Sequence, residues 1–169
     1  RQGELAMADQ FYILAFEAAS DKLVPLRRKA AALTAQAAMG RKEVAVEFRV
    51  GRKRVRVGAI AKGAGMIHPH MVPPTGPKHA TMLCFVTTDA AVALPMLRSS
   101  LERAVNKTFN RVSIDGDMST NDMVVVLANG LACNVRIAER TKEARLFQRA
   151  LEAAFAYLSK QMILDAEGA

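Results

Sequence analysis

The sequence predicts an α/β or α+β domain, and three observations carry that prediction. Segments with apolar residues at alternate positions, typical of strands, are interleaved with segments at helical spacing, and no segment repeats another. The 169 residues, 51% of them apolar, are enough for one compact core. Charged residues interrupt every apolar run before it reaches the roughly 18 residues that a membrane-spanning helix needs. A soluble domain with no membrane partner is therefore expected.

The first 41 residues differ in character from the rest. Phe11, Leu14 and Ala18 recur at helical spacing in a segment rich in alanine, leucine and charge, and Pro25 is a natural break. Residues 1–41 are therefore expected to form a helical segment of uncertain origin, with two helices over 4–39. Residues 42–169 are expected to form the domain proper.

A β-hairpin is predicted at the start of that domain. Apolar residues alternate with charged ones from Val44 to Val50, and the alternation resumes at Val55 after a turn at Gly51-Arg52. The hairpin carries much of the formal net charge of +8. No aromatic residues interleave with these charges, as a platform for single-stranded nucleic acid requires. A solvated hairpin face is favoured over a nucleic-acid groove.

The remaining elements follow from local pattern. Residues 62–80 hold glycines, four prolines and all three histidines, which predicts a functional loop. Five elements are expected after it: a strand over 81–88 buried on both faces, a helix beginning at Pro95, a strand reached through Phe109 and Val112, a helix over 124–129, and a final helix over 142–164. Residues 119–122 suit the cap of the fourth element and Gly130 its end.

Eight residues are considered as candidate metal ligands: Asp115, Asp117, Asp122, His68, His70, His79, Cys84 and Cys133. The aspartates lack the register and the closing glutamate of a calcium loop, so a turn and a helix cap are favoured. The histidines share a proline-rich loop without helical spacing. The cysteines lie among apolar neighbours and are expected to be buried and reduced, as in the cytosol. We predict no metal site and no cofactor.

Several unrelated motifs follow one another in a fixed order. They are residues 62–69 (KGAGMIHP), 80–83 (ATML), 87–90 (TTDA), 115–122 (DGDMSTND), 127–130 (LANG) and 165–169 (DAEGA). In this order they resemble the signature of the ornithine acetyltransferase family, which includes glutamate N-acetyltransferases. The resemblance covers roughly residues 42–169 and corresponds to the middle of a family member. Such an ordered set is specific, whereas any one motif alone would be weak.

The resemblance implies a self-processing fold of layered sheets flanked by helices. In this family the precursor cleaves itself between alanine and threonine, here Ala80 and Thr81, into α- and β-chains. The enzyme then transfers acetyl from N-acetylornithine to glutamate in arginine biosynthesis, and some members also use acetyl-coenzyme A as co-substrate. The implied partners are these small molecules, the protein's own α- and β-chains and further αβ units of a homo-oligomer, with no nucleic acid. The implied location is the cytoplasm, or an organelle in a eukaryote.

The chemistry explains why a threonine after a cleaved bond suits this reaction. A hydroxyl is a poor nucleophile without a base, and cleavage would free an α-amino group of Thr81 with a pKa of about 7.7–8 next to that hydroxyl. An acetyl-Thr81 ester would split the transfer into two steps. By resemblance, Lys62 contacts substrate and Glu167 holds the amino group of ornithine or glutamate. The simpler alternatives are a threonine that begins a strand, a solvated loop lysine and a fraying terminal acid.

Other functions remain open because the sequence departs from the family pattern. Residues 72–79 intervene before the Ala80–Thr81 pair like an insertion, residues 36–39 replace an expected threonine-rich motif, and residues 1–41 contain no recognisable oxyanion-hole pair. These features favour a catalytically impaired fragment or homologue as the alternative. An N-terminal-threonine hydrolase and a basic nucleic-acid-binding module are further alternatives.

Overall fold

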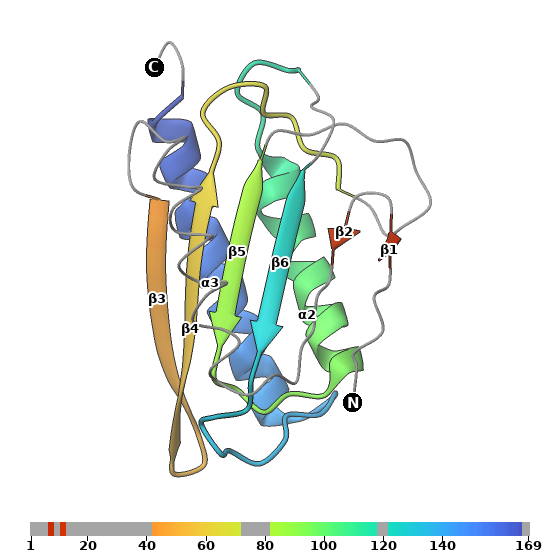
Figure 1. Ribbon diagram of the computed structural model, residues 1–169, viewed down its shortest axis with the longest axis vertical. Helices are drawn as coiled ribbons and strands as arrows, with labels where there is room; N and C mark the ends of the chain where they lie inside the picture. Colours follow the sequence, from red (N-terminus) through yellow and green to blue (C-terminus); the bar gives the residue numbers. More distant parts are fainter. Residues whose placement is uncertain (1–6, 9–10, 13–41, 72–81, 118–121, 167–169) are drawn as a thin grey trace.

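The computed structural model describes residues 7–8, 11–12, 42–71, 82–117 and 122–166 (Figure 1). Near the N-terminus, β1 (Met7–Ala8) pairs antiparallel with β2 (Phe11–Tyr12). These four residues are extended, so the prediction of helix is wrong for them. The rest of the predicted helical segment over 1–41 lies outside the described residues.

A four-stranded sheet forms the centre of the domain. Its order is β3 (Lys42–Val50), β4 (Lys53–Lys62), β5 (Leu83–Thr88) and β6 (Met123–Ala128). The pairings of β3 with β4 and of β4 with β5 are antiparallel, whereas β5 and β6 are parallel. The predicted hairpin is confirmed, and Gly51 supplies its turn with a φ of +59°.

Two long helices cover one face of this sheet (Figure 1). They are α2 (Leu94–Lys107), with Pro95 in its first turn, and α3 (Lys142–Leu164). Both confirm their predictions because their apolar residues recur at helical spacing and face the sheet. Phe109, Phe147 and Phe155 are fully buried between the two layers. None of the described helices is both long and apolar enough to span a membrane.

Three predicted elements differ from the structure. Residues 124–129 were expected to be helical, but residues 124–128 belong to β6, whose last five residues are all buried and therefore show no alternation. The strand expected beyond Phe109 is absent from this described part, where Phe109–Arg111 forms the 3₁₀ turn η1. The strand predicted over 81–88 is confirmed from Leu83 onward, although its second face is only half-buried.

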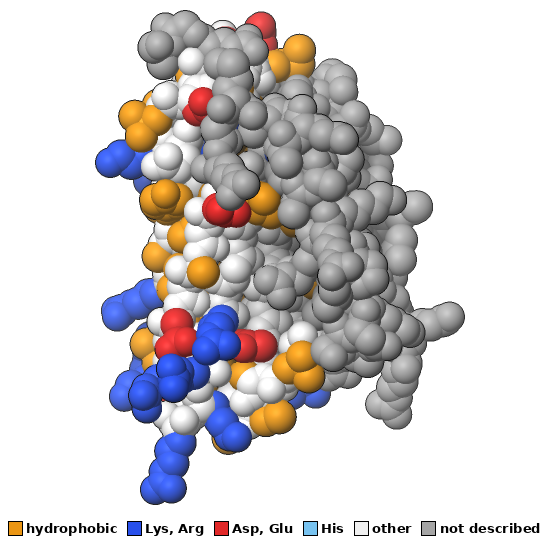
Figure 2. All heavy atoms as spheres, turned by 60° about the vertical axis from the view of Figure 1, so that its left-hand side comes forward, with side chains coloured by type: hydrophobic (Ala, Val, Ile, Leu, Met, Phe, Trp, Pro, Cys, Tyr) orange, Lys and Arg blue, Asp and Glu red, His pale blue; other side chains and the backbone are white. Residues whose placement is uncertain are grey.

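Basic side chains gather at the tip of the β3–β4 hairpin, where they face solvent as predicted (Figure 2). Glu47 lies among them and forms ion pairs with Arg56 at 3.0 Å and Arg54 at 3.8 Å. The exposed basic residues of the tip are Arg49, Arg52, Lys53, Arg54 and Arg56. This geometry fits a solvated face with internal charge compensation.

Candidate active site

Several predicted site segments meet at one edge of the sheet. Because β4 and β5 are antiparallel, the last residue of β4, Lys62, pairs with the first residue of β5, Leu83. The parallel pairing of β5 and β6 places Met123 beside Leu83 at the same edge. In Figure 1 this is the upper end of the sheet, where α3 also ends. The described residues Gly63, Met82 and Asp122 therefore lie at the same edge of the sheet.

The backbone of Met82 is held on both sides by the residues that begin β6. Its N–H donates to the Asp122 carboxylate at 2.6 Å, and its carbonyl accepts from the N–H of Met123 at 2.9 Å. Met82 is fully buried and Asp122 is 5% exposed. Burial raises the pKa of Asp122 to about 6, while the Met82 N–H opposes that shift. A buried carboxylate thus touches the residue that directly follows Thr81.

The glycine-rich loop after β4 packs closely on this arrangement. Gly63 has a φ of +154°, and a β-carbon there would lie 2.9 Å from side-chain atoms of Ile67 and Met162 and 3.8 Å from Met82 Cα. The positive φ favours glycine here, and a larger residue would also force the flexible ends of the Ile67 and Met162 side chains to shift. The loop is tied down by Asp115, whose carboxylate accepts hydrogen bonds from the N–H groups of Met66 and Ile67.

Asp115 forms the turn that was favoured from sequence, since its carboxylate accepts the Asp117 N–H at 3.1 Å, and it also holds the loop after β4. Slight desolvation favours its neutral form, but hydrogen bonds from the backbone of Met66, Asp117 and Ile67 outweigh this and lower the pKa of the carboxyl. Asp115 consequently stays ionised and holds the loop that follows Lys62. Asp122, expected as a helix cap, instead precedes a strand.

The C-terminal end of α3 is anchored at the same edge by an ion pair. Lys42, the first residue of β3, pairs with Asp165, which follows the last turn of α3. The Lys42 side chain is 1% exposed and the Asp165 side chain 25%. Asp165 lies two residues before Glu167 in the sequence. The pair therefore fixes the chain just before the third predicted site residue.

The predicted site residues are only partly described. Lys62 is half-buried and is the last residue of β4, directly before the glycine-rich loop to which the sequence assigned it. Ala80, Thr81 and Glu167 lie outside the described residues, although the neighbours Met82 and Asp165 are both at this edge. The role of Asp122 was missed by the sequence interpretation. The apolar run of β6 directly after it was the signal for a strand that could have revealed it.

The two cysteines lie in opposite environments. Cys84 is fully buried, and burial raises the pKa of its thiol well above the usual range. Cys133 is exposed, so the prediction that it is buried is wrong; it lies just after a turn, with a φ of +50°. Within the described ranges, no three His, Cys, Asp or Glu side chains lie close enough together to hold a metal ion.

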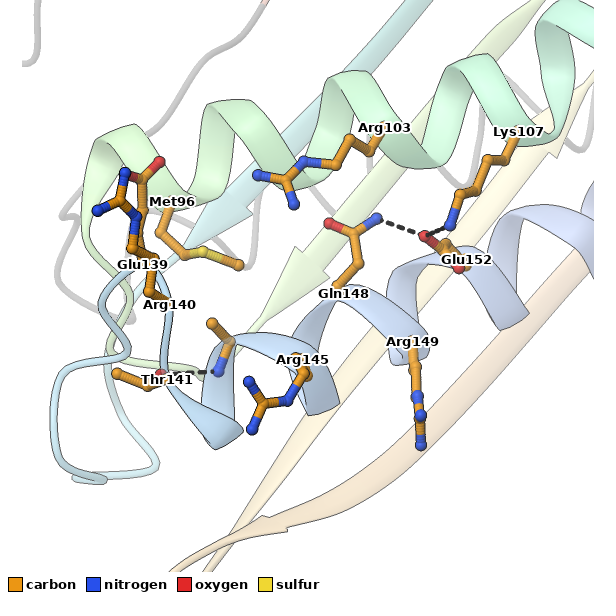
Figure 3. A pocket seen from close by; sticks show the side chains of 11 residues that line it. Met96, Arg103, Lys107, Glu139, Arg140, Thr141, Arg145, Gln148, Arg149 and Glu152 are labelled. Carbon is orange, nitrogen blue, oxygen red and sulfur yellow. Dashed lines mark hydrogen bonds and ion pairs between the residues drawn. The ribbon is translucent and has the colours of Figure 1, made fainter.

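A separate groove of about 440 Å³ lies between α2 and α3, away from this edge (Figure 3). Five of its eleven lining residues are Arg or Lys and two are Glu. Lys107 from α2 pairs with Glu152 from α3 at 2.7 Å, and Gln148 donates to the same carboxylate at 2.8 Å. Thr141 caps the N-terminus of α3 by accepting from the Ala144 N–H at 3.0 Å.

Known proteins with similar sequences and structures match this architecture. A crystal structure of the arginine biosynthesis bifunctional protein ArgJ of Bacillus halodurans aligns with a TM-score of 0.51 at 48% sequence identity. The alignment covers 53% of this chain and 42% of that one. The described domain therefore shares its mixed α/β fold with that part of the ArgJ structure.

Sequence comparison gives the family. The chain belongs to the ArgJ family, whose model matches residues 7–169. It is 49% identical over 128 residues to the arginine biosynthesis bifunctional protein ArgJ of Symbiobacterium thermophilum and 52% identical over 128 residues to the glutamate N-acetyltransferase of Methanocaldococcus jannaschii. Each alignment covers 76% of this chain, but the chain spans only 30% and 29% of those relatives.

Proposed function

We propose that this chain is part of a glutamate N-acetyltransferase that moves acetyl from N-acetylornithine to glutamate through an acetyl-Thr81 intermediate. One observation carries the proposal: the segments next to residues 62, 81 and 167, far apart in sequence, meet at one edge of the sheet. A reaction between two small molecules needs a nucleophile and substrate-holding charges in one place. Membership of the ArgJ family supports the same reaction.

The proposed sequence begins with self-cleavage. The Thr81 hydroxyl attacks the carbonyl carbon of Ala80, the peptide C–N bond breaks, and water hydrolyses the resulting ester to leave an N-terminal Thr81. The freed α-amino group then takes the proton of the hydroxyl as that hydroxyl attacks the acetyl carbonyl of the donor. The amine of ornithine leaves with a proton.

Glutamate completes the cycle. Its amino group attacks the acetyl-Thr81 ester and releases N-acetylglutamate, so ping-pong kinetics are expected. In this proposal Lys62, at the end of β4, pairs with a substrate carboxylate, and Glu167 holds the substrate's amino group. Acetyl-coenzyme A is a possible second donor of the same acetyl group. The proposed active form is an assembly of cleaved αβ units in the cytoplasm.

Intact-mass measurement of the purified chain tests the proposal. We expect fragments corresponding to residues 1–80 and 81–169, and a Thr81→Ala variant that stays uncleaved. The same samples are assayed for transfer of acetyl from labelled N-acetylornithine to glutamate. A wild-type chain that remains intact would contradict the nucleophile, and release of free acetate without N-acetylglutamate would identify a hydrolase instead.

A further inference from the structure

A buried carboxylate next to the proposed nucleophile has no role in the chemistry above. Asp122 is 5% exposed and lies at the start of β6, where its carboxylate accepts the N–H of Met82 at 2.6 Å. Among the described residues no Lys or Arg forms an ion pair with it. An unpaired buried carboxylate is unfavourable for folding. Its presence is explained better by what it holds than by stability.

The hydrogen bond acts on a peptide group that Thr81 shares. A peptide unit is planar, so the N–H of residue 82 lies in one plane with the carbonyl and the Cα of residue 81. An acceptor that fixes this N–H therefore fixes the peptide plane that ends at the Cα of residue 81, the atom to which the side chain and amino group of Thr81 are bonded. The Met123 N–H holds the other side of Met82 through its carbonyl at 2.9 Å.

The surrounding packing leaves this peptide group little freedom. Met82 has no exposed surface, and its Cα lies 3.8 Å from the position that a β-carbon on Gly63 would take. The strands on either side supply a regular ladder only from Leu83 onward. At residue 82 the ladder is replaced by a side-chain acceptor, and that acceptor is Asp122. The N–H of the residue that enters β5 is thus held by one carboxylate oxygen, while its carbonyl is held by the Met123 N–H.

We propose that Asp122 is a positioning residue that orients the Thr81 nucleophile by accepting the Met82 N–H. This inference rests on the proposed function of Thr81. The role requires an acceptor oxygen at this position and does not require a negative charge. It therefore distinguishes two substitutions of similar size. Asparagine keeps the acceptor, whereas leucine removes it.

The test compares Asp122→Asn, Asp122→Leu and Thr81→Ala in the purified full chain, with Glu152→Gln in the groove between α2 and α3 as a matched control. Cleavage after residue 80 is followed by intact mass, acetyl transfer by kcat and KM, and folding by urea unfolding. We expect Asp122→Leu to lower the cleavage rate and kcat about 100-fold with little change in KM, since misplacement by about 1 Å costs that much. Asp122→Asn and Glu152→Gln should retain both rates within a few-fold.

Stability separates positioning from a merely structural role. Asp122→Asn removes the buried charge and keeps the acceptor, so it should be at least as stable as the wild type. Asp122→Leu also leaves the buried Met82 N–H without an acceptor, a cost that offsets the gain from removing the charge, so it should remain folded in the urea titration. Only the leucine variant should lose activity. Wild-type rates in Asp122→Leu would overturn the inference while leaving Thr81 as nucleophile. Equal losses in Asp122→Asn and Asp122→Leu would overturn it in favour of a role for the charge. A wild-type chain that is not cleaved would reject the proposed function itself.

Discussion

Charged side chains occupy two regions of this molecule under opposite conditions. At the edge of the sheet, Lys42 and Asp122 are 2% and 5% exposed, and each has a specific partner fixed by the fold. In the groove between α2 and α3, Lys107 is 60% exposed at its side chain and pairs with Glu152 over water-accessible surface (Figure 3). A charge at the edge of the sheet therefore has a large free-energy cost of burial and depends on one specific partner. A charge in the groove stays hydrated, so its burial costs little free energy and its partner can be replaced.

The largest expected effect concerns the ion pair that anchors the end of α3. Asp165→Ala would leave the Lys42 ammonium buried without its partner, and we expect a loss of about 3–5 kcal/mol in the free energy of unfolding. Lys42→Met would leave a carboxylate that is 25% exposed and can be hydrated, so its loss should stay under about 2 kcal/mol. Urea unfolding of both variants measures the asymmetry. Equal losses would show that the buried ammonium is not the costly member.

The next effect is the pH dependence contributed by Asp122. Its pKa rises from an ordinary 3.8 to about 6 on folding, so the folded protein binds more protons than the unfolded chain between these values. The contribution of Asp122 to stability is therefore most favourable below pH 3.8 and is lost as the pH rises through about 6. At pH 7.5 the buried charge should destabilise the fold by an amount on the order of 2–3 kcal/mol.

Asp122→Asn removes this titration and keeps the acceptor for Met82. The free energy of unfolding of the variant relative to that of the wild type should rise by about 2–3 kcal/mol from pH 4 to pH 7.5. Urea unfolding of both proteins at both pH values measures this rise. Comparing the two proteins cancels the titration of all other groups to first order. A difference in stability that does not change with pH would show that Asp122 is hydrated in the folded state.

The spacing of apolar residues was sufficient to predict the type of an element where that element exposes one face to solvent. The hairpin of β3 and β4 alternates apolar and charged residues, and α3 carries its apolar residues at helical spacing, so both were predicted from sequence. In β6 the residues from Val124 to Ala128 are all buried, and a strand without alternation cannot be told from a short buried helix by period alone. Cap-like residues before it then favoured the wrong choice.

The site was predictable in its residue types and only partly in its assembly. Motifs in the sequence identified Lys62 and the segment beginning at Thr81, but the contact between Met82 and Asp122 spans 40 residues. It follows from the parallel register that sets Leu83 beside Met123, and no local pattern specifies that register. The ion pair of Lys42 with Asp165 joins residues 123 apart because α3 packs on β3, and no local pattern specifies that packing either.

The smallest expected effect is in the groove. Lys107→Gln and Glu152→Gln should each change the free energy of unfolding by less than about 1 kcal/mol, because an exposed pair gains little over its hydrated partners. A double-mutant cycle should give a coupling of a few tenths of a kcal/mol that weakens further in about 1 M salt, where screening is nearly complete. Desolvation of Glu152 works against ionisation, but its hydrogen bonds with Lys107 and Gln148 outweigh this and lower the pKa of its carboxyl. A coupling above about 2 kcal/mol that survives high salt would place this pair with the buried charges of the sheet edge and would remove the distinction between the two regions.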